Sequence, residues 1–468
     1  MARRQTLALS PEERRGFLGL SAAATCGTVA YHLLIGNFLA LFANQMGFSP
    51  ALIGLLYLSV QAPAIFQVLV ARYVDRHGGK RPALMGFLCS PVALLFLIFS
   101  PQVTAWGGHW AGVASVFLGV VAYTVSNLTV GASWMPLLRV NLPEGRLAEL
   151  IGGINRVAML IGLGATLGAS FWLGEGPKLW HFQALFIVGA ILAGARGILF
   201  RHVRDVTPQP DAPSEPIWQG LGALWDDVRF RRLITFTVLG FVAGGLVGPF
   251  RPLYMKALGF SDRFAAIVTV SLVLGVYGVM SPVWGALTDR YGSRGAYVIG
   301  GIGCMAGHLV LCLATGHTRV DAALLVLSLF LGAAFWGGFD FGNIKRLFSL
   351  VPRERQSLYM TVYMITSSFS VAFGSFLGGL IVKLVRWASP DLPGAIGFER
   401  LLDYRVLFLT AAAGMVVAIG YSRRMMALEE ITTGRLLVYL RLRMQRTLMT
   451  GFPGIIRKRV PSEELPPK

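Results

Sequence analysis

The chain has 468 residues, of which 54% are apolar and only 14% are charged. Soluble domains carry charge on roughly a quarter of their residues. Lysine and arginine number 42 against 23 aspartates and glutamates, which leaves a net charge of +19. This composition excludes a soluble enzyme and a disordered chain. Because the basic residues lie between apolar runs rather than on one face, we expect no nucleic-acid partner. The four cysteines stand inside apolar runs without ligand-like spacing, so we expect neither a disulfide framework nor a metal site.

Apolar runs long enough to cross a bilayer recur along almost the whole chain. They predict an all-α polytopic membrane protein with twelve transmembrane helices, at residues 17–43, 51–73, 82–100, 110–137, 149–173, 183–200, 232–256, 263–287, 296–315, 321–344, 357–384 and 404–421.

One long polar interruption, with four prolines among charges, separates six apolar runs from six. The predicted organisation is a cytoplasmic amino-terminal segment, a six-helix bundle, a cytoplasmic linker, a second six-helix bundle and a basic amphipathic tail, at residues 1–16, 17–200, 201–231, 232–421 and 422–468. The basic residues concentrate on one side of this topology, which predicts that both termini are cytoplasmic. We expect the tail to lie on the anionic inner leaflet of the membrane.

Two segments in corresponding positions of the two halves match each other. Residues 35–49 read IGNFLALFANQMGFS, and residues 247–261 read VGPFRPLYMKALGFS. The glycine pair Gly164 and Gly168 has a counterpart in Gly374 and Gly378, and both pairs favour close helix packing. The halves are therefore predicted to be two copies of one unit in the same orientation. Substrates of such parallel repeats bind near the bilayer midplane, between the copies.

The connection at residues 285–294 reads GALTDRYGSR, and the connection at residues 71–81 reads ARYVDRHGGKR. Both resemble the signature loop of the major facilitator superfamily, the second copy more closely than the first. Together with the twelve spans and the repeat, the resemblance implies a secondary transporter that works by alternating access.

The resemblance also implies a conformational role for the loop residues Asp75, Arg76, Asp289 and Arg290, which would hold the cytoplasmic side shut. A carboxylate there can accept charge-assisted hydrogen bonds from nearby arginines and helix ends. The alternative is an ordinary basic turn on the cytoplasmic side.

Asp340 is the only acidic residue deep within a predicted span. Arg156, in another predicted span, lies at a similar distance from the cytoplasmic side, and we expect an Asp340–Arg156 ion pair that bridges the halves as a gate. Two alternatives remain open. Asp340 could instead carry a coupling proton or bind substrate, or it could pair locally with Lys345 or Arg346.

The first helix of each half lines the cavity in this family, which makes His32 and Asn37 candidates for substrate or proton coupling. An imidazole titrates near neutral pH, although a neutral histidine bonded to another helix is the alternative. Arg251, flanked by prolines, is a candidate outer gate or anion attractor, with an interfacial arginine as the alternative. We expect Arg196 to reach the cytoplasmic interface.

Polar side chains of the fourth and tenth predicted helices complete the candidates. Tyr123, Asn127, Trp336 and Asn343 are plausible cavity walls around an amphipathic ligand. Helix packing is the alternative role for the aromatic ones.

These features predict a monomeric transporter of a small organic solute in a bacterial inner membrane. Proton coupling and export are open, and so is the cargo: Arg156, Arg251 and His32 suit an organic anion, whereas Asp340 among aromatic residues suits an amphipathic cation. The alternative is a non-transporting assembly or lipid-handling factor on the same scaffold. We expect no enzyme and no cofactor, because no nucleophile–base, metal or phosphate-loop pattern is present.

Overall fold

The structure is a computed structural model that describes residues 11–67, 70, 73–74, 77–142, 147–205, 224–350, 356–389 and 401–425. Within these ranges the regular elements are all helices. Eleven of them are long and apolar enough, by length and composition, to cross a membrane, and a shorter apolar helix covers Pro50–Phe66. The predicted all-helical membrane fold is confirmed.

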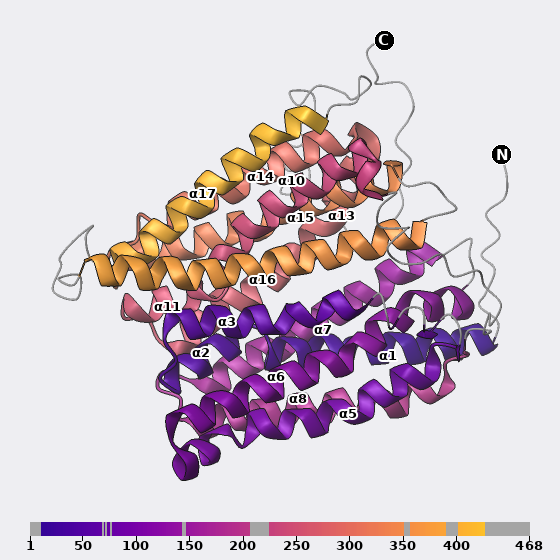
Figure 1. Cartoon of the computed structure of the whole chain (residues 1–468), viewed down its shortest axis with the longest axis horizontal. Helices are drawn as coiled ribbons and strands as arrows, with labels where there is room; N and C mark the ends of the chain where they lie inside the picture. The colour runs from indigo at the N-terminus through magenta and orange to yellow at the C-terminus, as the bar shows by residue number, and fades with distance from the viewer. Residues whose placement is uncertain are drawn as a thin grey trace.

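The first part of the chain forms the lower group of helices in Figure 1, drawn in indigo to purple. Its elements are α1 (Pro11–Leu34), α2 (Asn37–Gln45), α3 (Pro50–Gln61), the 3-10 turn η1 (Ala62–Phe66), α5 (Lys80–Ile98), α6 (Ser100–Asn141), α7 (Leu147–Leu173), α8 (Leu179–Leu199) and η3 (Phe200–His202).

The second part forms the upper group, drawn in pink to yellow (Figure 1). Its elements are α10 (Val228–Val247), α11 (Phe250–Ala257), α12 (Asp262–Ala266), the π turn η4 (Ile267–Leu272), α13 (Val273–Tyr291), α14 (Ser293–Leu311), α15 (Arg319–Leu350), α16 (Gln356–Ala388), α17 (Leu402–Ser422) and η7 (Arg423–Met425).

The first helix of each group is broken at the same place, where the sequence predicted a continuous span. The break between α1 and α2 falls at Gly36, where a Cβ would lie 2.8 Å from the carbonyl oxygen of His32. The break between α10 and α11 falls at Gly248 and Pro249, and the proline has no N–H to continue the helical ladder. Both breaks leave backbone groups at membrane depth, which is tolerated where protein or a cavity surrounds them.

The repeated Gly-Phe-Ser segment adopts one local structure in both groups. Gly47 and Gly259 have φ angles of 82° and 100°, the left-handed region that glycine enters without strain. Ser49 then caps α3 by accepting from the Leu52 N–H, and Ser261 caps α12 by accepting from the Phe264 N–H. The sequence repeat is therefore also a structural one at this turn.

Apolar packing joins the two groups on one side only. One cluster of buried residues is continuous across both, and it includes Phe38 and Phe42 of α2 with Phe250 and Tyr254 of α11. Two further clusters each stay within one group, near the connections predicted to be cytoplasmic. Figure 1 shows α11 beside α2 and α16 along α3 at the joined side. The two halves thus meet on the side away from the predicted cytoplasmic loops.

Glycines bring helix backbones into contact where the halves meet. A Cβ on Gly54 of α3 would lie 2.7 Å from the carbonyl oxygen of Ser375 in α16. Within the second half, a Cβ on Gly374 would overlap the carbonyl of Val242 in α10. The prediction of close packing fails for Gly164 and Gly168 of α7, where nothing lies within 4 Å of an added Cβ. Both glycines lie on an exposed face of α7, whereas Leu163 and Thr166 in the same stretch contact Gly275 and Ser271 of the second half.

We predict that Gly374→Ala lowers the melting temperature of the purified protein, because the added methyl group overpacks the α10–α16 contact at a cost of about 1–3 kcal/mol. The matched control is Gly420→Ala in α17, where nothing lies within 4 Å of the added Cβ. The control should melt at or slightly above the wild-type temperature, since alanine favours helix over glycine. Equal melting temperatures for the two variants would contradict this account of α10 and α16.

Candidate functional site

A cavity of about 250 Å³ lies between the two halves. Side chains or backbone of α1, α3, α10, the π turn and α16 line it, so that both halves contribute. Its polar residues include Tyr31, His32, Tyr57 and Gln61 from the first half and Ser375 from the second. Ligand pockets usually enclose about 300–1,000 Å³, so the cavity in this conformation is small.

Two of the predicted residues, His32 and Asn37, line this cavity. The Asn37 amide donates a hydrogen bond of 3.1 Å to the carbonyl oxygen of Thr269, which lies in the π turn of the opposite half. The His32 ring packs edge-on against Tyr31, with 5.4 Å between ring centroids. The Tyr57 hydroxyl donates to the carbonyl oxygen of Gly36 at 2.9 Å and so supports the break between α1 and α2.

The π turn explains why a backbone carbonyl is available to the opposite half. A π turn shifts the hydrogen-bond register within a helix, and such turns are frequent at functional sites. In this protein it covers Ile267–Leu272, and Thr269 and Val270 both line the cavity. Among the residues that the structure describes, a π turn occurs in the second half only, so the repeat in the sequence did not predict it.

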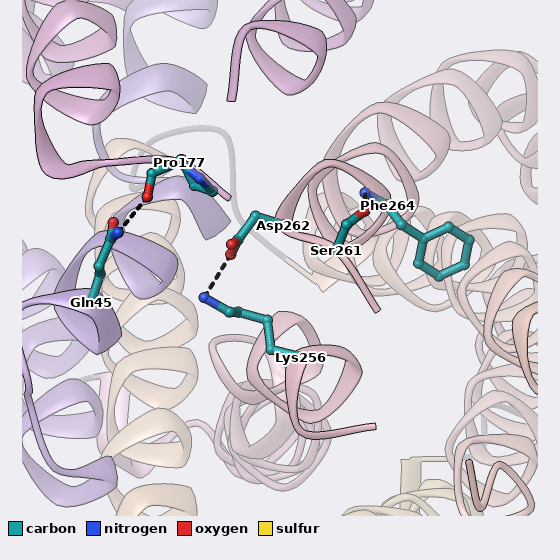
Figure 2. Close-up of polar contacts among 6 residues, drawn as sticks. All are labelled: Gln45, Pro177, Lys256, Ser261, Asp262 and Phe264. Carbon is teal, nitrogen blue, oxygen red and sulfur yellow. Dashed lines mark hydrogen bonds and ion pairs between the residues drawn. The ribbon is translucent and has the colours of Figure 1, made fainter. Parts of the chain in front are cut away.

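Polar contacts also connect the halves beside the cavity, at the joined side. The Arg263 guanidinium of α12 forms an ion pair with the Glu175 carboxylate at 2.7 Å, and its backbone N–H donates to the carbonyl oxygen of Gly174 at 3.0 Å. We call this pair of contacts the outer latch. Two further contacts in the same region each stay within one half. Lys256 and Asp262 of the second half pair at 2.9 Å, and Gln45 of the first half donates to the carbonyl oxygen of Pro177 (Figure 2).

Sequence reasoning did not identify the outer latch. The available signal was a departure from the repeat, because Ser261-Asp262-Arg263 replaces Ser49-Pro50-Ala51 of the first half. That departure indicates a special role for Arg263, but only the structure places Glu175 against it.

Tyr123 and Asn127 lie inside the first half rather than on the cavity. The Asn127 side chain donates to the carbonyl oxygen of Tyr123 at 2.9 Å and accepts from Arg196 at 3.3 Å. The prediction that Arg196 reaches the interface is wrong. Its side chain points into the bundle, is 9% exposed and lies over the Phe87 ring at 4.4 Å.

Trp336, Asn343 and Arg251 lie inside the second half. Trp336 packs against Phe241 and Phe339, with ring centroids 5.2 and 5.5 Å away. Asn343 is fully buried. The Nε atom of Arg251 is buried without a hydrogen-bond partner in the described part of the chain. None of these three residues lines the cavity between the halves.

The expected Asp340–Arg156 ion pair does not form in this conformation. Arg156 is exposed, and the Asp340 carboxylate accepts a hydrogen bond of 3.3 Å from the Tyr277 hydroxyl of its own half. The physical reason is the missing shared core on that side of the molecule, where the buried clusters belong to one half each.

The structure does not describe the side chains of the four loop residues predicted to form the cytoplasmic gate. Asp75 and Arg76 lie outside the described residues. Asp289 and Arg290 belong to the last turns of α13, where the structure describes the backbone but not their side chains.

The family assignment can now be made from comparison with known proteins. A family model described as the Major Facilitator Superfamily matches residues 20–277 and 233–430. The chain belongs to the major facilitator superfamily. The family predicted from the sequence is thereby confirmed.

Curated members of the superfamily match parts of the chain. A Deinococcus radiodurans protein named as a sugar efflux transporter is 27% identical over 216 residues, which are 44% of this chain and 51% of the relative. The multidrug resistance protein MdtG of Salmonella choleraesuis is 28% identical over 162 residues, 33% of this chain and 39% of the relative. The chain thus spans about half of the first relative's length and less of the second's.

Solved structures of superfamily-like transporters share the fold. A bacterial homolog of the human lysosomal transporter Spinster, in an inward-facing and occupied conformation, superposes with a TM-score of 0.67 at 14% identity, over 91% of this chain and 100% of that chain. The nucleoside transporter NupG gives a TM-score of 0.63 at 17% identity, over 90% and 100% of the two chains. A D-xylose-proton symporter gives 0.64 at 15% identity, over 86% and 97%.

We predict that Glu175→Gln weakens the outer latch and makes the cavity more accessible from the joined side. An exposed ion pair contributes about 0.2–1 kcal/mol, which corresponds to about a 1.5–5-fold rise in accessibility. The measurement is the rate at which a membrane-impermeant maleimide labels a cysteine introduced at Ser375, with the native cysteines replaced by serine.

The matched control is Lys178→Gln, which removes an exposed charge beside Glu175 without touching the latch. The exchanged pair Glu175→Arg with Arg263→Glu should return the labelling rate toward the wild-type value. A rate that is the same in Glu175→Gln as in the wild type would show that the ion pair does not hold this side closed.

Proposed function

We propose that the protein is a secondary transporter that moves a small organic solute across the membrane by alternating access. The observation that carries this proposal is the cavity lined by both halves. One continuous apolar core closes it on one side, and separate cores flank it on the other. Parallel repeats with a site between them work by rocking one half against the other.

In this proposal the conformation is closed toward the outside and accessible from the cytoplasm. The outward-open state then requires the outer latch and the Asn37–Thr269 hydrogen bond to break. Both lie between the halves, so a rigid-body rotation breaks them together and leaves each half's own core intact. Two sets of contacts on the opposite side would offset that loss. One is the Arg156–Asp340 pair, and the other is the predicted cytoplasmic gate of Asp75, Arg76, Asp289 and Arg290.

We further propose that protons drive transport, with Asp340 as the coupling carboxyl. Asp340 has a hydroxyl partner in Tyr277, and no Lys or Arg pairs with its carboxylate in the part of the chain that the structure describes. Protonation of a carboxyl that has no cation partner leaves no cation unpaired, so this carboxyl can bind a proton without that cost. His32 is the second candidate, because its imidazole lies on the cavity itself.

The names of the relatives support export as the direction, since one is named as a sugar efflux transporter and the other as a multidrug resistance protein. The apolar helices and the family make this an integral membrane protein. A bacterial inner membrane, cytoplasmic termini, a monomeric state and contact of the basic tail with anionic lipid complete the proposal. The positive-inside distribution of the basic residues supports the orientation.

The test is transport in proteoliposomes with an imposed pH gradient, using solutes selected by a thermal-shift screen of sugars, nucleosides and drugs. We predict that Asp340→Asn abolishes accumulation driven by the gradient but retains exchange of solute across the membrane, because the amide cannot carry the proton. Asp226→Asn, at an exposed aspartate before α10, should transport like the wild type.

Full accumulation by Asp340→Asn with unchanged pH dependence would rule out the coupling role of this carboxyl. His32→Gln in the same assay then decides whether the imidazole carries the proton instead. Failure of the wild-type protein to move any solute that stabilises it would count against transport itself.

A further inference from the structure

Arg196 is a buried positive charge in the first half, and no acidic side chain pairs with it in the described part of the chain. It lies in the last turn of α8, and its side chain is 9% exposed. Its Nη1 atom donates to the Asn127 side-chain oxygen at 3.3 Å, and its Nε atom is buried without a hydrogen-bond partner. Across the described residues, no ion pair includes Arg196.

The surroundings of this guanidinium are built to hold it in place. At Gly27 of α1, a Cβ would lie 2.8 Å from the Arg196 Cζ atom, so the arginine rests directly on the helix backbone. The Asn127 amide nitrogen is held by the Tyr123 carbonyl oxygen at 2.9 Å and by the Ser90 hydroxyl at 3.4 Å. These bonds turn the side-chain oxygen of Asn127 toward Arg196.

The position of Arg196 relative to the central cavity follows from α1. Gly27 and Tyr31 are four residues apart and therefore lie on one face of the helix, about 6 Å from each other along its axis. Tyr31 lines the cavity. Arg196 thus lies one helical turn from the cavity, on the side where the two halves have separate cores.

An unpaired charge buried inside a helix bundle is costly, and such charges in membrane helices mark sites that interact with a partner or a transported species. Asn127 accepts a hydrogen bond from one of the five N–H donors of the guanidinium. The remaining N–H donors suit the two oxygens of a carboxylate or phosphate. We propose that Arg196 and Asn127 form an anion subsite, and that the cargo is an organic anion with a carboxylate or phosphate group. This inference rests on the proposed transport function.

Binding of small anions to the purified protein in detergent tests this subsite without any transport step. The probes are benzoate, phenylphosphonate and inorganic phosphate, with neutral benzamide as the matched non-ionic compound and chloride held constant. We expect at least one anion to raise the melting temperature by about 2–4 °C at saturation, and benzamide to leave it unchanged.

Three variants separate the subsite from general salt effects. Asn127→Asp places a carboxylate beside Arg196, so it should raise the basal melting temperature and abolish the response to anions. Arg196→Gln should also abolish the response. Lys383→Gln removes one exposed positive charge elsewhere and should respond like the wild type.

The Asn127→Asp variant keeps the test decisive where Arg196→Gln does not fold, because it retains the arginine and adds its counter-charge. Equal anion responses in the wild type and Asn127→Asp would overturn the proposal. The absence of a saturable response to all three anions in the wild type would overturn it as well. Failure of transport in proteoliposomes, with anion binding intact, would refute the proposed function and leave the subsite standing.

Discussion

The structure depends on one continuous apolar core that joins the halves on a single side. Phe38 and Phe42 of α2 pack in the same cluster as Phe250 and Tyr254 of α11, and the buried clusters on the opposite side belong to one half each. Because packing attraction acts only over short distances, the joined side resists separation and the other side does not. The cavity, the outer latch and the separation of Arg156 from Asp340 all follow from this asymmetry.

The broken first helices position the cavity within that core. A helix that ends in the membrane exposes backbone groups, which must be satisfied by protein or by a cavity. Tyr57 satisfies the carbonyl of Gly36 at the first break, and Asn37, which begins α2, bonds to Thr269 of the opposite half. The first break therefore also supplies one of the polar contacts between the halves.

Buried charges are kept within single halves rather than between them. Arg196 lies in the first half, whereas Asp262, Asp321, Asp403 and Arg405 lie in the second. If the buried charges were paired across the halves, separating the halves would leave each charge unpaired at a cost of several kcal/mol. Exposed pairs such as Arg263–Glu175 are weaker, so the halves can part without that penalty.

The sequence by itself determined the helical membrane fold, its repeat and its family, because apolar runs, positive-inside charge and the loop motif are local patterns. It also identified His32 and Asn37 as cavity residues, because the first helix of each half lines the cavity in the family that the sequence resembles, although the sequence did not predict the breaks in these helices. Which side chains meet was decided by the tertiary structure alone. Arg196 points inward and donates to Asn127, and Glu175 forms an ion pair with Arg263. Asp340 accepts a hydrogen bond from Tyr277 and does not pair with Arg156. Two of these contacts lie within one half and the third joins the halves. Each depends on how neighbouring helices pack, and the distance between packed helices is not encoded in any local pattern.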